Sequence, residues 1–414
     1  MTAQLGHSPV RISRVVLGCM FPARLRQPDV EHIVHAAFDA GITSFDTAPL
    51  YDFHRGEEQL GRALRDRWQR VQILTKAGLR WDGTHGRELF SFTDSRGQKR
   101  VVRRDSRPES LRDEVRQSLL RLGADSVDLM QLHHPDEDTP IEQSIEVLEQ
   151  LVRAGQIRAY GVSNFSPQQL EAACAAAGNR DAAGGGVAGA AGSGVAGAAG
   201  GGIAGAAGSG VAGAVGSGVA GAAGGGVAGA AGGGVAGAAG GGGAARGGVA
   251  SLQSEYNLLQ RWPERELLPL CLDRGVGFLA YSPLAKGVLA GHSRLRSGAE
   301  RRSSRGSHYD DAVARLALRP ALSGTLDALA RAYGRSPAQL ALTWLLAQPG
   351  VSGVVVGASS VAQVQELALA AEVKLPQQDV DALSNAFAHA GFWLKVAERV
   401  RGSVFGRVVR RVAD

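Results

Sequence analysis

Stretches rich in β-branched and apolar residues alternate with amphipathic stretches along most of this chain, and this alternation restricts the possible fold more than any other feature. Short apolar runs bounded by turn residues predict buried strands, and longer amphipathic runs predict helices. The strand candidates are 15–19, 42–48, 71–78, 127–134, 158–164, 249–257, 276–284 and 351–358. The helix candidates are 29–40, 57–68, 107–122, 140–154, 166–178, 264–273, 324–348 (divided near Gly334 and Pro337) and 360–371.

Eight strands that alternate with helices favour a closed parallel (β/α)8 barrel of the TIM type, in the α/β class. The alternative is an open doubly wound sheet, which normally carries a Gly-x-Gly-x-x-Gly turn after its first strand. No such turn follows residues 15–19. We therefore expect a single barrel domain over residues 1–414, a length that one barrel domain can accommodate.

One segment, residues 182–248, breaks this pattern because it consists almost entirely of Gly and Ala. Its period of eight residues matches neither an α-helix nor a coiled coil, and its glycine content opposes regular helix. Such a segment cannot bury enough apolar surface to offset its ordering entropy, which predicts a disordered low-complexity insertion in the barrel. A silk-like strand former and a membrane span are the weaker alternatives. The β-branched residues that mark the repeat are Val187, Val195, Ile203, Val211, Val219, Val227 and Val235.

The charge and cysteine content exclude several classes of protein. The net charge of +6 comes from scattered basic residues, except around 294–305 and in a basic C-terminal extension at 391–414, so nucleic-acid binding is not expected. Three dispersed cysteines suit neither a disulfide framework nor a zinc site, and no metal is expected. The first residues lack a signal-peptide pattern, and no span is expected elsewhere, which predicts a cytoplasmic protein.

Several predicted strands end on side chains that can take part in proton transfer. Asp46 closes one strand and is followed by Tyr51, Lys76 closes the next, and His133 and His134 close a third. In a barrel of this kind the active site lies at the carboxyl ends of the strands. A lysine beside a phenol lowers the phenol pKa by stabilising the phenolate, and a carboxylate keeps that lysine charged when it is buried. Singly, each residue has an ordinary structural explanation, such as a turn cap for Asp46; together they predict a proton-transfer site.

The same residues lie in motifs that resemble the aldo-keto reductase family. Phe-Asp-Thr-Ala at 45–48 with Tyr51, and Gly-Glu-Glu-Gln-Leu-Gly-Arg-Ala-Leu at 56–64, are similar to its first signature. Leu-Thr-Lys at 74–76 and Asp-Leu-Met-Gln-Leu-His-His-Pro at 128–135 are similar to its lysine and histidine strands. Gly-Gln-Ile-Arg-Ala-Tyr-Gly-Val-Ser-Asn-Phe-Ser at 155–166 is the most specific stretch. Apart from the Gly/Ala insertion, the similarity runs from about Leu5 to about Ala390.

The resemblance implies a (β/α)8 barrel that binds NADPH and reduces aldehydes and ketones. It implies that Tyr51 donates the proton, that Lys76 and Asp46 tune it, and that His133, preferred over His134, orients the substrate. It also implies a cofactor site along the later strands. Its residues, from the nicotinamide to the adenosine end, would be Ser163, Asn164, Gln253, Tyr281, Ser282, Pro283, Leu284, Lys286, Gly287, Gly357, Ser359, Gln363 and Glu366.

Two departures from the family pattern affect specificity. Asp52 and His54 stand where the family often has glycine, which predicts a shifted substrate preference. No arginine lies in 357–367 to hold a 2′-phosphate, so NADH remains open beside NADPH. The aromatic residues Phe21, Phe53, Trp81 and Phe90 are candidates for the substrate pocket or for barrel packing.

These observations predict an NAD(P)H-dependent aldo-keto reductase, an oxidoreductase whose partner is a small carbonyl substrate. The first alternative is a catalytically slow subunit that senses the cofactor and regulates or binds a partner through the same barrel. A second alternative is a structural protein organised by the repeat. The sequence defines neither the physiological carbonyl nor the oligomeric state.

Overall fold

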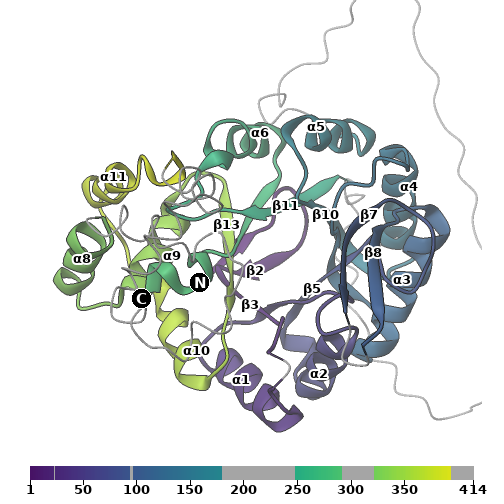
Figure 1. Ribbon diagram of the computed structural model, residues 1–414, viewed down its shortest axis with the longest axis horizontal. Helices are drawn as coiled ribbons and strands as arrows, with labels where there is room; N and C mark the ends of the chain where they lie inside the picture. The colour runs from purple at the N-terminus through teal and green to yellow at the C-terminus, as the bar shows by residue number, and fades with distance from the viewer. Residues whose placement is uncertain (23, 94–96, 180–247, 291–320, 393–414) are drawn as a thin grey trace, which may run out of the picture. The chain divides into compact units, whose positions relative to one another are not determined.

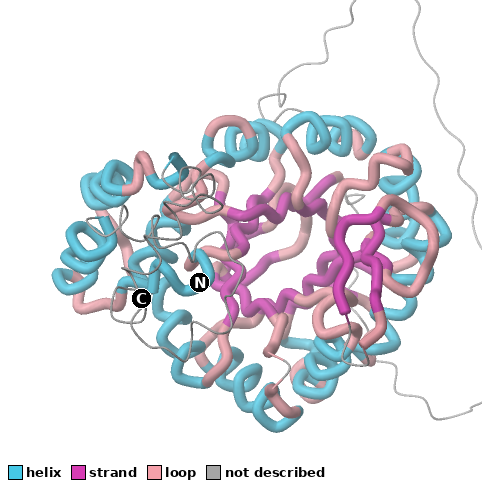
Figure 2. The backbone as a smooth tube through the Cα atoms, in the orientation of Figure 1, coloured by secondary structure: helices cyan, strands magenta, loops and turns pink. Residues whose placement is uncertain are grey.

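A computed structural model of the chain describes residues 1–22, 24–93, 97–179, 248–290 and 321–392. Eight strands form a closed barrel in the order β10-β11-β12-β13-β3-β4-β5-β9 (Figure 2). The predicted barrel and its eight strands are confirmed. Their bounds are β3 Val15–Gly18, β4 Ser44–Asp46, β5 Gln72–Ala77, β9 Val127–Leu132, β10 Ile157–Ser163, β11 Val249–Glu255, β12 Gly277–Tyr281 and β13 Val351–Gly357.

Every neighbouring pair in the barrel is parallel, and the first and last strands close the ring. Val354 of β13 pairs with Val15 of β3, and Lys76 of β5 pairs with Gln131 of β9. Because all eight strands run the same way, their carboxyl ends open onto one face of the barrel. This face collects the polar residues that follow the apolar runs.

Helices surround the barrel (Figure 1). Their bounds are α1 Gln27–Asp39, α2 Arg55–Leu64, α3 Pro108–Leu122, α4 Ile141–Arg153, α5 Pro167–Ala176, α6 Leu267–Arg274, α8 Asp327–Ala332, α9 Pro337–Ala347, α10 Val361–Ala368 and α11 Gln377–Ala386. Short turns of helix lie at Trp68–Arg70, Trp262–Glu264, Ala285–Ala290, Ala321–Leu326 and Leu369–Ala371. The predicted helices are present with ends shifted by a few residues, whereas α11 was not predicted.

Local sequence explains where several of these helices begin. Ser166 caps α5 by accepting a hydrogen bond from the Gln169 N–H (3.2 Å), and Pro167 occupies the first turn, as predicted. The predicted break within 324–348 is also present. Gly334 has a left-handed φ of 60°, and Ser336 then caps α9.

The core has two layers. Leu74, Leu129 and Leu279 belong to the apolar cluster inside the barrel, and Leu5 and Ile12 belong to the same cluster. Leu5 directly follows β1 (Thr2–Gln4) and Ile12 lies within β2 (Arg11–Ser13), so this antiparallel pair contributes side chains to the barrel interior. The larger cluster packs the outer sides of the strands against the helices.

A three-stranded antiparallel sheet was not predicted. It consists of β6 (Leu79–Arg80), β7 (Glu88–Thr93) and β8 (Lys99–Arg104), and it lies between β5 and α3 in the chain. Figure 1 shows β7 and β8 beside the barrel. Because this sheet starts directly after β5, it lies at the face onto which the carboxyl ends of the barrel strands open.

The predicted insertion at 182–248 lies outside the described residues except for Gly248, and so do the basic run 294–305 and most of the extension at 391–414. Within the part of the chain that the structure describes, no helix combines the length and apolar character that a membrane crossing requires.

Candidate active site

The carboxyl ends of β4 and β5 bring a buried ion pair together. Lys76 Nζ donates to Asp46 Oδ1 (2.6 Å), and both side chains are almost fully buried. The same ammonium donates to the Thr47 carbonyl oxygen (3.0 Å) and to Tyr51 Oη (3.2 Å). An ammonium has three hydrogens, so all of its donors are used. Because Tyr51 Oη accepts from Lys76, the Tyr51 hydroxyl proton remains available to another acceptor.

The turn between β4 and α2 positions Tyr51. Its backbone N–H donates to the Ala48 carbonyl (3.0 Å), and the Gly56 N–H donates to the Tyr51 carbonyl (3.2 Å). A Cβ atom at Gly56 would lie 3.1 Å from the Tyr51 carbonyl oxygen and 3.3 Å from Tyr51 Cβ. The glycine therefore allows α2 to begin close against the tyrosine.

Burial and the ion pair act in opposite directions on the two titrating groups. Burial raises the pKa of Tyr51, and the charge of Lys76 only partly offsets this, so the net shift is upward. The sequence-based expectation of a lowered phenol pKa is thus wrong for the protein without ligands, because desolvation outweighs the ammonium. Burial lowers the pKa of Lys76, but the interactions with Asp46 and then with Tyr51 outweigh it, and the net shift is upward. At neutral pH Tyr51 therefore keeps its proton and Lys76 its charge.

The two histidines that follow β9 both face the cavity at this end of the barrel. The His133 ring lies 6.0 Å from the Tyr51 ring, centre to centre and nearly perpendicular to it. Burial, followed by the charge of Lys76, holds the pKa of His133 well below its usual range. Burial and then Arg104 lower the pKa of His134 to about 4. Both imidazoles are neutral at pH 7, and His133 is the one beside Tyr51.

A cavity of about 660 Å³ opens above these residues. Every residue predicted for the site lines it except Lys76, which lies beneath Tyr51 and Asp46. The structure thus brings together residues from six barrel strands or the turns that follow them. Lining residues that the sequence reasoning missed include Gly18, Met20 and Pro22; Gly18 ends β3, so the strand-end rule could have found it.

Polar groups from β10, β11 and β12 form one side of the cavity. Asn164 Nδ2 donates to the His133 carbonyl (2.9 Å), and Tyr281 Oη donates to Asn164 Oδ1 (2.9 Å). Gln253 Nε2 donates to Asp46 Oδ2 (2.8 Å), which connects this side of the cavity to the ion pair. Ser163 Oγ accepts from Asn164 Nδ2 (3.1 Å). These bonds hold the side chains in place before any ligand binds.

The turn that follows β12 forms the next part of the cavity wall. In this turn Ser282, Ala285 and Lys286 have φ of 49°, 48° and 54°. Asn164, directly after β10, also has a positive φ, of 63°. Residues other than glycine rarely adopt this left-handed conformation, and clusters of them occur at ligand sites. Pro283, Leu284 and Gly287 complete this wall.

Residues around the start of α10 form the end of the cavity wall that follows β13. Gln363 Oε1 accepts from the Ser359 N–H (2.8 Å), and Ser360 Oγ accepts from the Gln363 N–H (3.3 Å). Gly357, Ser359, Gln363 and Glu366 line this end. Ser360 is therefore the helix cap, and Ser359 is left at the cavity wall.

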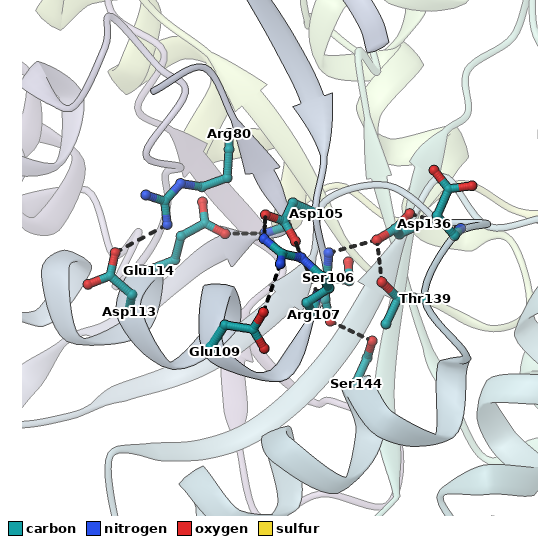
Figure 3. Close-up of polar contacts among 12 residues, drawn as sticks. Arg80, Asp105, Ser106, Arg107, Glu109, Asp113, Glu114, Asp136, Thr139 and Ser144 are labelled. Carbon is teal, nitrogen blue, oxygen red and sulfur yellow. Dashed lines mark hydrogen bonds and ion pairs between the residues drawn. The ribbon is translucent and has the colours of Figure 1, made fainter. Parts of the chain in front are cut away.

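A second polar network supports the strand ends from outside the barrel (Figure 3). Glu114 of α3 accepts a hydrogen bond from the backbone N–H of Gly78 (2.5 Å), two residues beyond Lys76. Asp136, two residues beyond His134, accepts from the backbone N–H of Ser106 (2.9 Å). Helix α3 and the segment before it are thereby joined to the chain just beyond β5 and β9.

The chain belongs to the aldo/keto reductase family, whose model matches residues 14–183 and 244–387. The gap in this match falls within the Gly/Ala-rich segment.

The proteins that this chain resembles include a reductase, a dehydrogenase and a channel subunit. The chain is 29% identical to Aldo-keto reductase YhdN of Bacillus subtilis over 81% of this chain and 76% of that protein. It is 26% identical to a probable voltage-gated potassium channel subunit beta of Oryza sativa, over 87% and 88%. Among solved structures, the glycerol dehydrogenase AKR11B4 from Gluconobacter oxydans matches with a TM-score of 0.66 and 26% identity, covering 94% of this chain and 95% of that one.

Proposed function

We propose that the protein reduces an aldehyde or ketone to an alcohol with a nicotinamide cofactor, and that Tyr51 donates the proton. The observation that carries this proposal is the hydrogen bond from Lys76 Nζ to Tyr51 Oη (3.2 Å). It points the tyrosine's own proton away from the ammonium, and Tyr51 also lines the cavity. Carbonyl reduction by oxidoreductases of this family agrees with this chemistry.

The residues around the cavity suit a dinucleotide. Ser163, Asn164 and Gln253 carry amide and hydroxyl groups that match a nicotinamide carboxamide, and the Tyr281 ring lies next to them. The 282–287 turn would hold the pyrophosphate, with Lys286 as a charge partner. Gly357, Ser359, Gln363 and Glu366 would contact the adenosine end. When bound, the reduced cofactor supplies the hydride.

The chain's own residues supply the proton step. His133, neutral because of its lowered pKa, donates an N–H hydrogen bond to the carbonyl oxygen and orients it. As negative charge develops on that oxygen, Tyr51 transfers its hydroxyl proton to it. Lys76 stabilises the phenolate that forms, and Asp46 keeps the lysine charged. We expect NADPH as the cofactor, and NADH is tested beside it.

The test follows the absorbance loss of NADPH, and separately of NADH, with a panel of aldehydes and ketones. Oxidation of cofactor that depends on both protein and carbonyl supports the proposal. Tight cofactor binding without turnover on any carbonyl would overturn it. That outcome would favour the regulatory alternative, for which the similar channel subunit is a precedent.

A further inference from the structure

Strands β5, β9, β10 and β11 place four residues in one row across the inside of the barrel. Gln131 of β9 pairs with Lys76 on one side and with Gly161 on the other. Ser251 of β11 packs directly against Gly161, because a Cβ atom on this glycine would lie only 2.1 Å from Ser251 Oγ. Residues paired in register on neighbouring strands point to the same face of a sheet. Because the Lys76 side chain lies inside the barrel beside Asp46, the Gln131 side chain also points inward.

This row contains two polar side chains that the fold buries completely. Gln131 and Ser251 are both fully buried. Within the part of the chain that the structure describes, Gln131 Oε1, Gln131 Nε2 and Ser251 Oγ form no hydrogen bond. Polar atoms at this depth bond to protein groups or to ordered water, because the loss of their hydration is otherwise not replaced. These three atoms therefore indicate a small polar ligand inside the barrel.

The polar groups next to the row already have partners of their own. The Lys76 ammonium places its three hydrogens on other acceptors, so it has none left for Gln131 Oε1. Gln253, two residues beyond Ser251 on the same strand, donates from Nε2 to Asp46 Oδ2 (2.8 Å). The ion pair and its neighbours are thus complete without Gln131 and Ser251.

The chemistry of the three atoms selects the ligand. Gln131 Oε1 needs a donor, Gln131 Nε2 needs an acceptor, and the Ser251 hydroxyl can act as either. A metal ion supplies no acceptor and would lie in the same row as the Lys76 ammonium, and a simple anion supplies no donor. Water donates and accepts, and a buried water typically forms about three hydrogen bonds.

We propose that Gln131 and Ser251 bind an ordered water molecule inside the barrel, in the row that contains Lys76. The water completes the hydrogen bonding of both side chains and keeps a polar environment next to the Lys76–Asp46 pair. Gly161 makes the site possible, because any larger residue there would displace the Ser251 hydroxyl. This water site is independent of the proposed carbonyl reduction and requires no bound cofactor.

A high-resolution crystal structure of the full chain tests the site without any substitution. We expect a solvent peak within about 3.2 Å of Ser251 Oγ and of one amide atom of Gln131. A direct hydrogen bond between the two side chains with no solvent peak beside them would overturn the proposal.

A double-mutant cycle tests whether the two side chains share one ligand. Urea denaturation gives the unfolding equilibrium constant of wild type, Gln131→Leu, Ser251→Ala and the double variant. Each single substitution leaves the other side chain with an incompletely bonded water, so we expect each to raise this constant about 10-fold. Once both polar groups are gone, no such group remains. The double variant should therefore rise at least about threefold less than the product of the two single effects.

An exposed glutamine supplies the control for this cycle. Gln69→Leu, in the short helical turn Trp68–Arg70, should change the unfolding constant by less than about threefold. Its effect should multiply with that of Ser251→Ala, because the two sites are independent. Equally independent effects of Gln131→Leu and Ser251→Ala would contradict a shared water. If Gln131→Leu does not fold, the wild-type crystal structure still decides the proposal.

Discussion

Buried ionisable groups lie on both sides of the end of strand β5, and the protein stabilises them in different ways. On the inner face, Lys76 and Asp46 pair at 2.6 Å, and the net pKa of Lys76 rises. On the outer side, Glu114 accepts a hydrogen bond from the backbone N–H of Gly78 and forms no ion pair within the part of the chain that the structure describes. Burial raises the pKa of Glu114 to about 8. Lys76 thus keeps its charge because it is paired, whereas the Glu114 carboxyl, which has no such partner, is neutralised.

The charge state of each group corresponds to the role that we assign to it. A buried charge is costly unless it is paired or neutralised, and both solutions are compatible with folding. Only the paired one leaves an ammonium beside a phenol that can transfer a proton. The outer carboxyl needs no charge to accept a hydrogen bond from Gly78, and it therefore suits a structural role.

Removing the inner cation should have the largest effect. Lys76→Met would leave Asp46 buried without its partner and Tyr51 without the ammonium that stabilises the phenolate. We expect turnover to fall about 10²–10⁴-fold and the free energy of unfolding to fall by about 3–5 kcal/mol. Steady-state assays and urea denaturation measure the two effects. Lys99→Met, at an exposed end of β8, is the control and should change neither.

Breaking a second buried ion pair, which lies on the outer side of β5, should have a smaller effect. It should lower the free energy of unfolding and leave turnover unchanged. Glu57 is fully buried, bonds Arg121 Nε (2.7 Å) and accepts from Thr75 Oγ1 (2.8 Å). Glu57→Gln should lower the free energy of unfolding by about 3 kcal/mol, because it leaves the Arg121 charge without its partner.

The neighbouring Glu58 offers a matched control for this substitution. It forms an exposed pair with Arg62 (3.8 Å), so Glu58→Gln should cost less than about 1 kcal/mol. Equal losses in the two variants would show that burial of the pair is unimportant. A loss of turnover in Glu57→Gln larger than in Lys76→Met would erase the distinction between the two faces.

Replacing the neutral carboxyl of Glu114 should have the smallest effect on the free energy of unfolding, and the size of this effect should depend on pH. The pKa of Glu114 is about 8 in the folded state against about 4.3 for an unfolded glutamate, so the folded state binds more protons between these values. The contribution of this group to the free energy of unfolding therefore falls as pH rises from about 4.3 to about 8. Glu114→Gln removes this dependence and should gain roughly 1–3 kcal/mol over wild type between pH 5 and 8.

Urea denaturation at several pH values measures this difference. Glu109→Gln, at an exposed position on the same helix, should retain the wild-type pH dependence. Parallel curves for wild type and Glu114→Gln would mean that Glu114 is charged throughout, and the contrast between the two faces would then be lost.

The sequence was sufficient for the barrel because each of its strands is a short apolar run, which burial on both sides requires. It was not sufficient for β7 and β8. Val102 is the one buried residue in these two strands, and Lys99–Arg104 is mostly basic, so no apolar period marks them. Helix α11 was missed for a similar reason, since few of its side chains are buried.

The candidate site shows the same limit. Strand ends located Asp46, Lys76 and His133, because the barrel gathers such ends on one face. Glu57 and Glu114 looked like ordinary helical acids, and their burial depends on how α2 and α3 pack against β5. The net direction of the Tyr51 pKa was also beyond the sequence, since it depends on how much desolvation opposes the Lys76 charge.

The most direct test of Tyr51 as the proton donor uses the Tyr51→Phe variant. Its turnover and its affinity for the cofactor are both measured and compared with those of wild type. Phenylalanine keeps the ring but removes the hydroxyl that Lys76 bonds at 3.2 Å. We predict a loss of turnover of about 10²–10⁴-fold, with a cofactor Kd within about threefold of wild type. Wild-type turnover in this variant would contradict the assignment of Tyr51 as the donor.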